Sequence, residues 1–389
     1  MTAQEYLLLY RDNLLNDVIP FWLKHSKDSE NGGYFTCLGE TGNVYDTDKF
    51  IWLQCRQVWG FAMLYNRLEQ KQEWLDFAIH GANFLIKHGR DAQRGWYFSL
   101  NRQGLPLTQA FNIFSDCFAA MAFGQLFLAT NKDEYAEIAK DTFYNILRRQ
   151  KDPKGKYSKI FPGTRPMQSF SLPMILSNLV LEIENLLESS LVEETIFNAV
   201  HAVMELFYDE HSGLIMENVT LDGKFSDSFE GRLINPGHGE EAMWFMMNIG
   251  ERTGNRELIK KAAAISLNIL KHSWDAEHGG LYNFLDVKGY PPQQLEWNQK
   301  LWWVHIETTI TMLKGYQLTG DKRCWEQFEK LHEYNWTHFV DRKNGEWYGY
   351  LSREGKILLP LKGGKWKGFF HVPRGLFQCW KTLESIEKN

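Results

Sequence analysis

The sequence predicts an all-α fold, a closed (α/α)6 barrel in which about twelve helices form two concentric layers with short β-hairpins on one face. Three observations lead to this prediction. A hairpin-like phrase recurs six times along the 389 residues, a strongly apolar stretch follows it, and an amphipathic stretch comes next. Six small units of this kind cannot each bury two helices alone, so they must stack on one another.

The recurring phrase consists of an Asp, a few polar residues, a Gly and then aromatic or apolar residues, as in DSENGGYF at Asp28 and DAQRGWYF at Asp91. Turn residues around a short aromatic run are typical of a β-hairpin, and most copies carry a second Gly about nine residues later. The anchoring glycines lie between 58 and 67 residues apart, at Gly33, Gly95, Gly155, Gly213, Gly280 and Gly345.

Two helices fit into the remainder of each unit. Residues 117–129 and 242–249 are apolar on all sides, which is typical of a fully buried inner helix. Residues 133–150 place apolar side chains at i, i+3, i+4 and i+7, which predicts an outer helix. An open α-solenoid would need polar capping repeats, but the terminal units are as aromatic as the middle ones. We therefore expect one catalytic domain over residues 1–389, closed into a ring.

The composition excludes several classes of protein. Hydrophobic residues make up 44% and charged residues 23%, which excludes a disordered chain. The net charge of −5, with both signs interspersed, argues against nucleic acid or an anionic membrane as the main partner. The uninterrupted apolar runs are short, so we expect no segment that could span a membrane. The start shows no basic and apolar stretch of the kind found in a secretory signal, so we expect none. Five scattered cysteines without a Cys-x-x-Cys favour a cytoplasmic protein with free thiols.

Three of the twelve histidines share one position in their repeat units. His238 and His305 lie 25 residues after the anchoring Gly of their units, and His371 lies 26 residues after its own. All three fall near the start of a predicted inner helix. In a closed ring, an equal position in the unit means an equal depth on the wall of the central cavity. The alignment therefore indicates a functional site more than three separately satisfied core histidines.

Other polar groups fall in the same window. Arg56 and Asn178 each lie 23 residues after the Gly of their unit. Glu307 lies two residues after His305. Arg374 lies three residues after His371, so it can share a helix face with it. Buried charges are costly without partners, so these groups are expected to pair with each other or with a ligand.

Imidazole and guanidinium groups in a cavity suit proton transfer at carbon. A neutral imidazole has a pKa near the working pH, so it can take or give a proton. Two imidazoles on opposing walls could remove a proton from one face of a carbon and return it to the other. A guanidinium could stabilise the oxygen anion formed between the steps. This chemistry is racemisation or epimerisation beside a carbonyl, or aldose–ketose isomerisation.

Other classes of site use the same residues. Glu241 and Glu307, with Asp116 as a spare, could form the carboxylate pair of a glycoside hydrolase, a class that also uses (α/α)6 barrels. The three aligned histidines with Glu241 could ligate a metal, although no His-Glu-x-x-His motif is present. A non-catalytic sugar-binding protein could use a similar aromatic cavity. The Gly-x-Gly-x-x-Ala of residues 237–242 follows no strand and lies in no βαβ unit, so it does not indicate a dinucleotide site.

Four segments carry a resemblance to a known family. They are KFIWLQCRQVW around Arg56, FEGRLINPGHGEEAMW around His238, LWWVHIE around Glu307 and GGKWKGFFHVPR around His371. Together they resemble the N-acyl-D-glucosamine 2-epimerase family, essentially from end to end. The resemblance implies an (α/α)6 barrel that interconverts N-acetyl-D-glucosamine and N-acetyl-D-mannosamine in carbohydrate metabolism. It implies that His238 and His371 are the acid/base pair and that Arg56 and Glu307 are essential.

The resemblance also bears on the substrate. Related neutral-sugar enzymes carry a further His on the third inner helix, and residues 171–182 have none, which favours the N-acetyl amino sugar over cellobiose or mannose. A neutral-sugar 2-epimerase or an aldose–ketose isomerase stays the alternative, followed by a hydrolase or a sugar-binding protein. The expected substrate-binding residues, from the resemblance and the shared position, are Glu241, Trp244, Trp303, Arg374, Asn178 and His305.

Cofactors and partners are implied by the resemblance alone. The family needs no metal and is modulated by ATP, which is not consumed, so ATP is expected as an allosteric activator. The best candidate for its site is the basic loop KDPKGKYSK, whose alternative interpretation is a solvated hairpin tip. The family is commonly dimeric, so a homodimer is expected. The loop lysines are Lys151, Lys154, Lys156 and Lys159.

Overall fold

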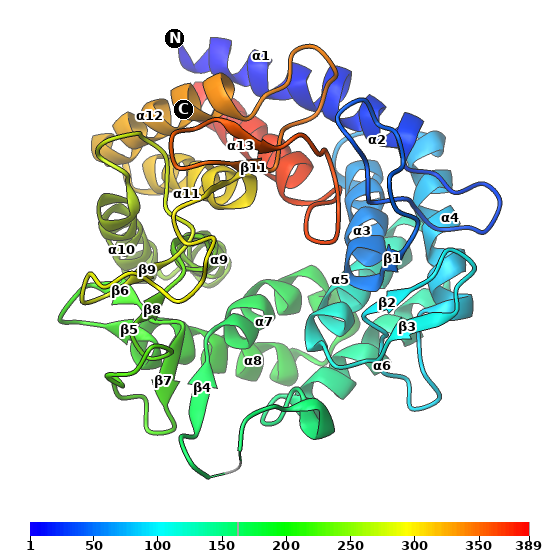
Figure 1. Cartoon of the computed structure of the whole chain (residues 1–389), viewed down its shortest axis with the longest axis horizontal. Coiled ribbons are helices and arrows are strands. Elements are labelled where there is room, and N and C mark those ends of the chain that lie inside the picture. Colours follow the sequence, from blue (N-terminus) through cyan, green and yellow to red (C-terminus); the bar gives the residue numbers. More distant parts are fainter. Residues whose placement is uncertain (162, 389) are drawn as a thin grey trace.

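The computed structural model describes residues 1–161 and 163–388 as a ring of helices in two layers around a central opening (Figure 1). The predicted (α/α)6 barrel is confirmed. The inner helices are α3 (Ile51–Arg67), α5 (Ile113–Thr130), α7 (Ser171–Glu182), α9 (Pro236–Thr253), α11 (Trp302–Thr319) and α13 (His371–Lys388). The outer helices are α4 (Gln72–His88), α6 (Asp133–Arg149), α8 (Ser189–His201), α10 (Arg256–Ser273), α12 (Lys322–His338) and the N-terminal helix.

The two ends of the chain close the ring. The N-terminal helix runs from α1 (Ala3–Asn13) through the π-turn η1 (Leu14–Val18) into α2 (Ile19–His25). It packs on α13, the last inner helix, and both termini lie together at the top of Figure 1. In the described ring, the N-terminal helix therefore takes the outer place beside α13.

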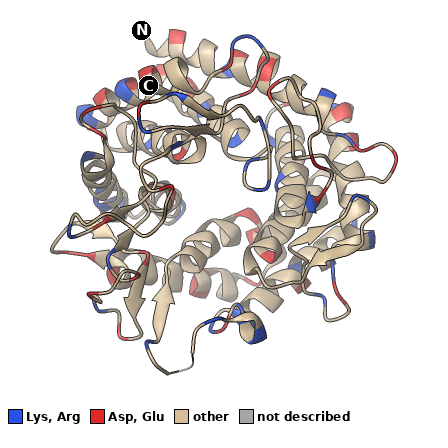
Figure 2. Ribbon diagram, in the orientation of Figure 1, with Lys and Arg blue, Asp and Glu red and all other residues tan. Residues whose placement is uncertain are grey.

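The burial pattern separates the two layers. Residues 117–126 of α5 are buried on every side, whereas outer helix α6 buries Tyr135 and Ile138 and exposes Glu134 and Glu137. By length and composition α5 could cross a membrane, with 18 residues and a mean hydropathy of 1.4, so the expectation that no segment would qualify is wrong. In the ring, 72% of α5 is buried. Figure 2 shows both signs of charge spread around the outer layer.

The predicted hairpins contain very short strands, which pair between neighbouring units. One strand of each pair comes just before an inner helix, and its partner belongs to the hairpin of the next unit. The pairs are β1 (Lys49–Phe50) with β2 (Ser99–Leu100), β4 (Met167–Ser169) with β7 (Asn218–Thr220), β8 (Leu233–Ile234) with β9 (Leu285–Asp286), and β10 (Lys300–Leu301) with β11 (Tyr350–Leu351). This pairing therefore lies directly before four of the six inner helices, α3, α7, α9 and α11.

Short elements complete the described chain. The remaining strands are β3 (Pro106–Thr108), β5 (Tyr208–Asp209), β6 (Leu214–Ile215) and β12 (Ile357–Leu359). The short helical turns are η2 (Gly155–Tyr157), η3 (Glu184–Leu186) and η4 (Ala202–Leu206).

The Asp of the recurring phrase forms a buried ion pair in three of the six units. In these units the Asp binds a buried Lys that lies in or near the strand before an inner helix. The pairs are Asp28–Lys49 at 2.9 Å, Asp275–Lys300 at 3.1 Å and Asp341–Lys362 at 2.8 Å. Each pair therefore ties a hairpin turn to the start of the inner layer.

Candidate active site

A cavity of about 650 Å³ opens between the first turns of the inner helices. Every inner helix contributes to its lining: Arg56 from α3, Phe118 from α5, Met174 from α7, His238 from α9, Trp303 from α11 and His371 from α13. The shared position in the repeat units therefore does bring side chains from distant parts of the chain to one place. Of the ten residues predicted for catalysis and substrate binding, five line the cavity, namely Arg56, His238, Glu241, Trp303 and His371.

Glu307 organises one side of the cavity from beneath its surface. It is fully buried, and its Oε1 lies 2.8 Å from Nδ1 of His371 and accepts a hydrogen bond of 2.7 Å from Arg374. Its Oε2 accepts the indole N–H of Trp244 at 2.9 Å. Arg374 also donates to Glu241. Glu307 therefore holds three side chains, and Arg374 joins the two carboxylates.

His371, the first residue of α13, is arranged as a proton acceptor. With Nδ1–H donated to Glu307, the ring presents Nε2 as its second nitrogen in the cavity lining. Burial lowers the pKa of His371 well below its ordinary value, and the positive charges of Arg56 and Arg374 act in the same direction. The imidazole is therefore neutral at neutral pH and keeps a lone pair for a proton.

His238, the third residue of α9, is arranged as a proton donor. Its backbone N–H is capped by the Asn235 side chain, and its Nδ1 lies 2.9 Å from Oε1 of Glu217. Burial alone would lower the pKa of His238, but the Glu217 carboxylate outweighs this effect and raises the pKa above its ordinary value. Each histidine therefore has its own contact between Nδ1 and a carboxylate, but the two pKa values are shifted in opposite directions. Such a difference is typical of the acid and the base of one reaction.

Glu217 was missed by reasoning from sequence. It lies between β6 and β7, and its carbonyl accepts the backbone N–H of Phe170 just before α7. It follows Gly213 by four residues, where the first two units have Cys37 and Ser99. A carboxylate at this position was the available signal, but nothing in the sequence shows that it reaches His238.

Trp303 lies between the two imidazoles. The ring centroid of Trp303 is 5.4 Å from that of His238 and 5.7 Å from that of His371. Its helix α11 packs against both α9 and α13 (Figure 1). The two histidines, on α9 and α13, therefore flank one aromatic side chain of the helix between them. The mechanism considered from sequence used two imidazoles on opposing walls.

Arg56 lines the cavity from α3, and within residues 1–161 and 163–388 it forms no ion pair with a carboxylate. Its guanidinium carbon lies 4.4 Å from the Trp52 ring centroid, 4.0 Å from that of Phe118 and 4.4 Å from that of Phe370. Among the described residues its Nε is buried without a hydrogen-bond acceptor. Burial lowers the pKa of Arg56 to about 9. A cation with an unused donor in an aromatic cage suits an anionic oxygen of a ligand.

Comparison with known proteins identifies the family. The family model described as N-acylglucosamine 2-epimerase (GlcNAc 2-epimerase) matches residues 33–374. The chain belongs to this family. The N-acylglucosamine 2-epimerase of Mus musculus is 40% identical over 380 residues, covering 96% of this chain and 90% of the mouse protein. That of Homo sapiens is 39% identical over 379 residues, covering 96% and 89%. The protein is therefore an epimerase, an enzyme of the isomerase class.

The fold agrees with this assignment. The solved structure of the cellobiose 2-epimerase from Bacillus thermoamylovorans B4167 superimposes with a TM-score of 0.83 at 22% sequence identity. The superposition covers 97% of this chain and 99% of the other. This superposition shows that the two proteins share the barrel fold.

Four predicted substrate-binding residues of the epimerase lie outside the cavity lining. Two of them, Trp244 and Arg374, donate to Glu307 beneath it, and the other two are His305 and Asn178. His305 is fully buried; its Nε2 accepts the backbone N–H of Leu281 at 2.9 Å, and its Nδ1 lies 2.7 Å from the carbonyl of Leu301. Burial lowers the pKa of His305 to about 3, so the ring is neutral. His305 thus shares the depth of the other histidines but turns toward the hairpin of its own unit.

Asn178 also lies below the cavity. It is the eighth residue of α7, whereas His238 is the third residue of α9. The third unit has a different spacing between its Gly and its inner helix, so an equal count from the Gly does not give an equal depth. Ser171, Met174 and Ile175 line the cavity from α7 instead.

A metal ion at this site would compete with the Arg374 guanidinium for the same carboxylates. Glu241, Glu307 and His371 each offer a ligand atom, and these atoms lie within 4.8 Å of one another. The Arg374 guanidinium donates to both carboxylates, so a protein cation already neutralises this cluster. A divalent ion would have to displace Arg374 and leave its charge buried without a partner.

A glycosidase pair is not supported by these contacts. Glu241 and Glu307 share the Arg374 guanidinium, and Glu307 is fully buried below the lining. The spare carboxylate Asp116 is bound to Arg149 at 3.0 Å and Asn145 at 3.3 Å, both on outer helix α6. Two carboxylates facing each other across a substrate, as hydrolysis requires, are not formed by these three.

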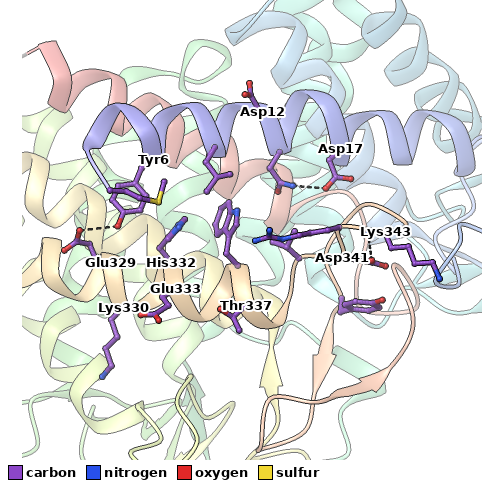
Figure 3. A pocket seen from close by; sticks show the side chains of 17 residues that line it. Tyr6, Asp12, Asp17, Glu329, Lys330, His332, Glu333, Thr337, Asp341 and Lys343 are labelled. Atoms are coloured by element: carbon purple, nitrogen blue, oxygen red, sulfur yellow. Dashed lines mark hydrogen bonds between the residues drawn. The ribbon is translucent and has the colours of Figure 1, made fainter.

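A larger hollow of about 1360 Å³ lies outside the ring, between α1 and α12 (Figure 3). Tyr6 donates to Glu329 across it at 3.2 Å. Burial lowers the pKa of His332 to about 4, so this histidine does not titrate near neutral pH. The groove does not repeat the acid/base arrangement of the central cavity.

The predicted effector lysines lie apart from the cavity lining. Lys151, Lys154, Lys156 and Lys159 are exposed in the segment around η2. Within residues 1–161 and 163–388, none of the four forms an ion pair. The segment is therefore a surface loop with a positive charge. Tyr157 in this loop donates to Gln109, and Arg149 donates to the carbonyl of Pro153 at 3.3 Å.

Proposed function

We propose that the protein interconverts N-acetyl-D-glucosamine and N-acetyl-D-mannosamine by proton transfer at carbon 2 between two histidines. The observation that carries the proposal is the pair His238 and His371, each bonded to its own carboxylate, with pKa values shifted in opposite directions around Trp303. The identity of about 40% with mammalian proteins named N-acylglucosamine 2-epimerase supports the choice of substrate.

The first step is removal of the carbon 2 proton. Ring opening exposes an aldehyde at carbon 1, which makes that proton acidic. His371 takes it on Nε2, and Glu307 stabilises the imidazolium through Nδ1. The electron pair of the broken C–H bond forms a double bond between carbons 1 and 2, and the π electrons of the carbonyl move to the carbon 1 oxygen. Arg56, with its unused Nε donor, stabilises the resulting enolate.

The second step is proton return from the other face. His238 is protonated in the starting state because Glu217 raises its pKa, and it gives its proton to carbon 2 with inversion. The electron pair returns to carbon 2, and the aldehyde re-forms. Exchange with solvent then resets the two imidazoles. In the reverse direction the same groups act with their roles exchanged.

Incubation of N-acetylmannosamine in deuterated water tests this function. The product is expected to be N-acetylglucosamine that carries deuterium at carbon 2. Loss of activity in EDTA with recovery in a divalent ion would favour a metal mechanism instead. Release of a monosaccharide from an oligosaccharide would favour a hydrolase, and sugar binding without interconversion would favour a binding protein.

The conditions of the reaction follow the family resemblance. We propose a cytoplasmic homodimer that needs no metal and is activated by ATP without consuming it. Support for an ATP site comes from the four exposed lysines at residues 151–159, whose charges are available to phosphate.

A further inference from the structure

Four buried polar atoms of the cavity lining lack a hydrogen-bond partner among the described residues. Three are donors: Nε1 of Trp52, Nε of Arg56 and Nε1 of Trp302. The fourth, Oδ1 of Asn283, is an acceptor. Buried polar groups are costly unless they are hydrogen-bonded, so a ligand in this cavity is expected to satisfy them.

The backbone holds Asn283 in place while its side chain stays uncommitted. The backbone N–H groups of Asn283 and Phe284 both donate to the carbonyl of Trp297, at 3.0 and 3.1 Å. Two residues upstream, Leu281 donates to His305 at 2.9 Å. Asn283 is only 3% exposed. Its carboxamide is thus presented to the cavity by a fixed segment, which is how a binding group is preorganised.

Strand pairing brings Asn283 next to the helix that carries His238. Leu285 of β9 pairs with Ile234 of β8 in an antiparallel register. Two residues beyond this pair, the chain reaches Pro236, the first residue of α9, on one side and Asn283 on the other. Asn283 and His238, the imidazole that acts at carbon 2 in the proposed function, line the same cavity.

We infer that Asn283 determines specificity by accepting the N–H of the N-acyl group on carbon 2. The inference rests on the proposed function, since carbon 2 must lie beside His238. An amide N–H is only a donor, so the three unpartnered donors of the lining cannot bind it, whereas Oδ1 of Asn283 can. The ligand feature recognised here is a secondary amide on the carbon that is epimerised.

Two open-chain probes test this assignment without turnover. One is the alcohol made by reducing N-acetylglucosamine, which keeps the amide but has no aldehyde. The other is the alcohol made by reducing 2-deoxyglucose, which has no substituent at carbon 2. Their dissociation constants are measured by calorimetry on the full chain. Asn283→Ala is expected to reduce the preference for the amide probe about 3- to 10-fold, the effect of one neutral hydrogen bond.

A matched control comes from the same hairpin. Gln294 also has a buried carboxamide oxygen with no hydrogen-bond partner in the described part of the chain, but it does not line the cavity. Gln294→Ala is therefore expected to keep the wild-type preference. Asn283→Leu fills the volume without an acceptor and gives a second reading if the alanine variant does not fold. An unchanged preference, or equal weakening of both probes, overturns the assignment. Absence of epimerisation by the wild-type protein would instead contradict the proposed function.

Discussion

The two halves of the inner ring face the cavity with different chemistry. Helices α9, α11 and α13 bring the imidazoles and carboxylates, among them His238, Glu241 and His371. Helices α3, α5 and α7 bring Arg56 together with apolar side chains such as Phe118 and Met174. The same repeat therefore provides proton transfer on one side and, on the other, a cation enclosed by aromatic and apolar groups.

Depth in the ring does not by itself decide the role of a side chain. His305 and His371 occupy nearly the same position in consecutive units. His371 is bonded to the carboxylate of a neighbouring helix and lines the cavity, whereas both nitrogens of His305 contact backbone atoms. Contacts between units, which the repeat does not specify, decide which histidine can transfer protons.

The largest effect is expected from the two cavity histidines. His238→Asn and His371→Asn should each abolish net epimerisation, with a loss toward the upper end of the about 10²–10⁴-fold range for a general acid or base. Interconversion of the two amino sugars, followed by chromatography, measures it. Near-normal turnover by His238→Asn would contradict the two-base assignment.

A smaller effect is expected from Glu217, which sharpens the difference between the two histidines. The neutral form of His371 and the protonated form of His238 are both required, so kcat/KM should follow a bell-shaped pH profile. Because Glu217 raises the pKa of His238, Glu217→Gln should move the descending limb to lower pH. The ascending limb, which follows the lowered pKa of His371, should stay in place.

The pH profile needs a control on the same kind of contact. Glu205 contacts His201 on the outer layer at 2.8 Å, so Glu205→Gln removes a carboxylate from an exposed histidine. This variant should keep the wild-type profile. A Glu217→Gln profile that coincides with wild type would show that Glu217 does not set the protonation of His238.

His305 should make the free energy of unfolding depend on pH. Its pKa is lowered to about 3 in the folded state, so as pH falls below about 6.5 only the unfolded chain binds its proton. This group therefore stabilises the fold fully above that pH and loses its effect as pH falls toward 3. Wild-type unfolding free energy should decline faster than that of His305→Gln, by up to about 1.4 kcal/mol per pH unit. Denaturant titrations at pH 7, 6 and 5 measure the two slopes, and equal slopes would contradict the buried neutral ring.

The smallest effect concerns the exposed loop around η2. Lys154→Ala combined with Lys156→Ala should weaken activation by ATP while basal turnover stays intact, because these side chains lie outside the cavity lining. Initial rates at increasing ATP concentration measure it. Unchanged activation would move the effector site elsewhere on the molecule.

Most of the ring was predictable from local patterns, because helix and hairpin periodicities repeat six times. The positions of His238 and His371 followed from the same repeat. Glu217, which contacts His238, and Asn283, which lines the cavity, were not predictable, since both lie next to strands that pair between units. Closure by the N-terminal helix was also missed, because no repeat relates α1 to the last inner helix.

Hydrogen exchange at carbon 2 tests the central claim most directly. Each amino sugar is incubated separately in deuterated water with wild type, His238→Asn or His371→Asn, and deuterium at carbon 2 is followed by NMR. We expect wild type to label both epimers and each variant to label only the epimer whose proton faces its remaining histidine, with the two variants selecting opposite epimers. A variant that labels both epimers, or two variants that select the same one, would contradict a two-histidine mechanism.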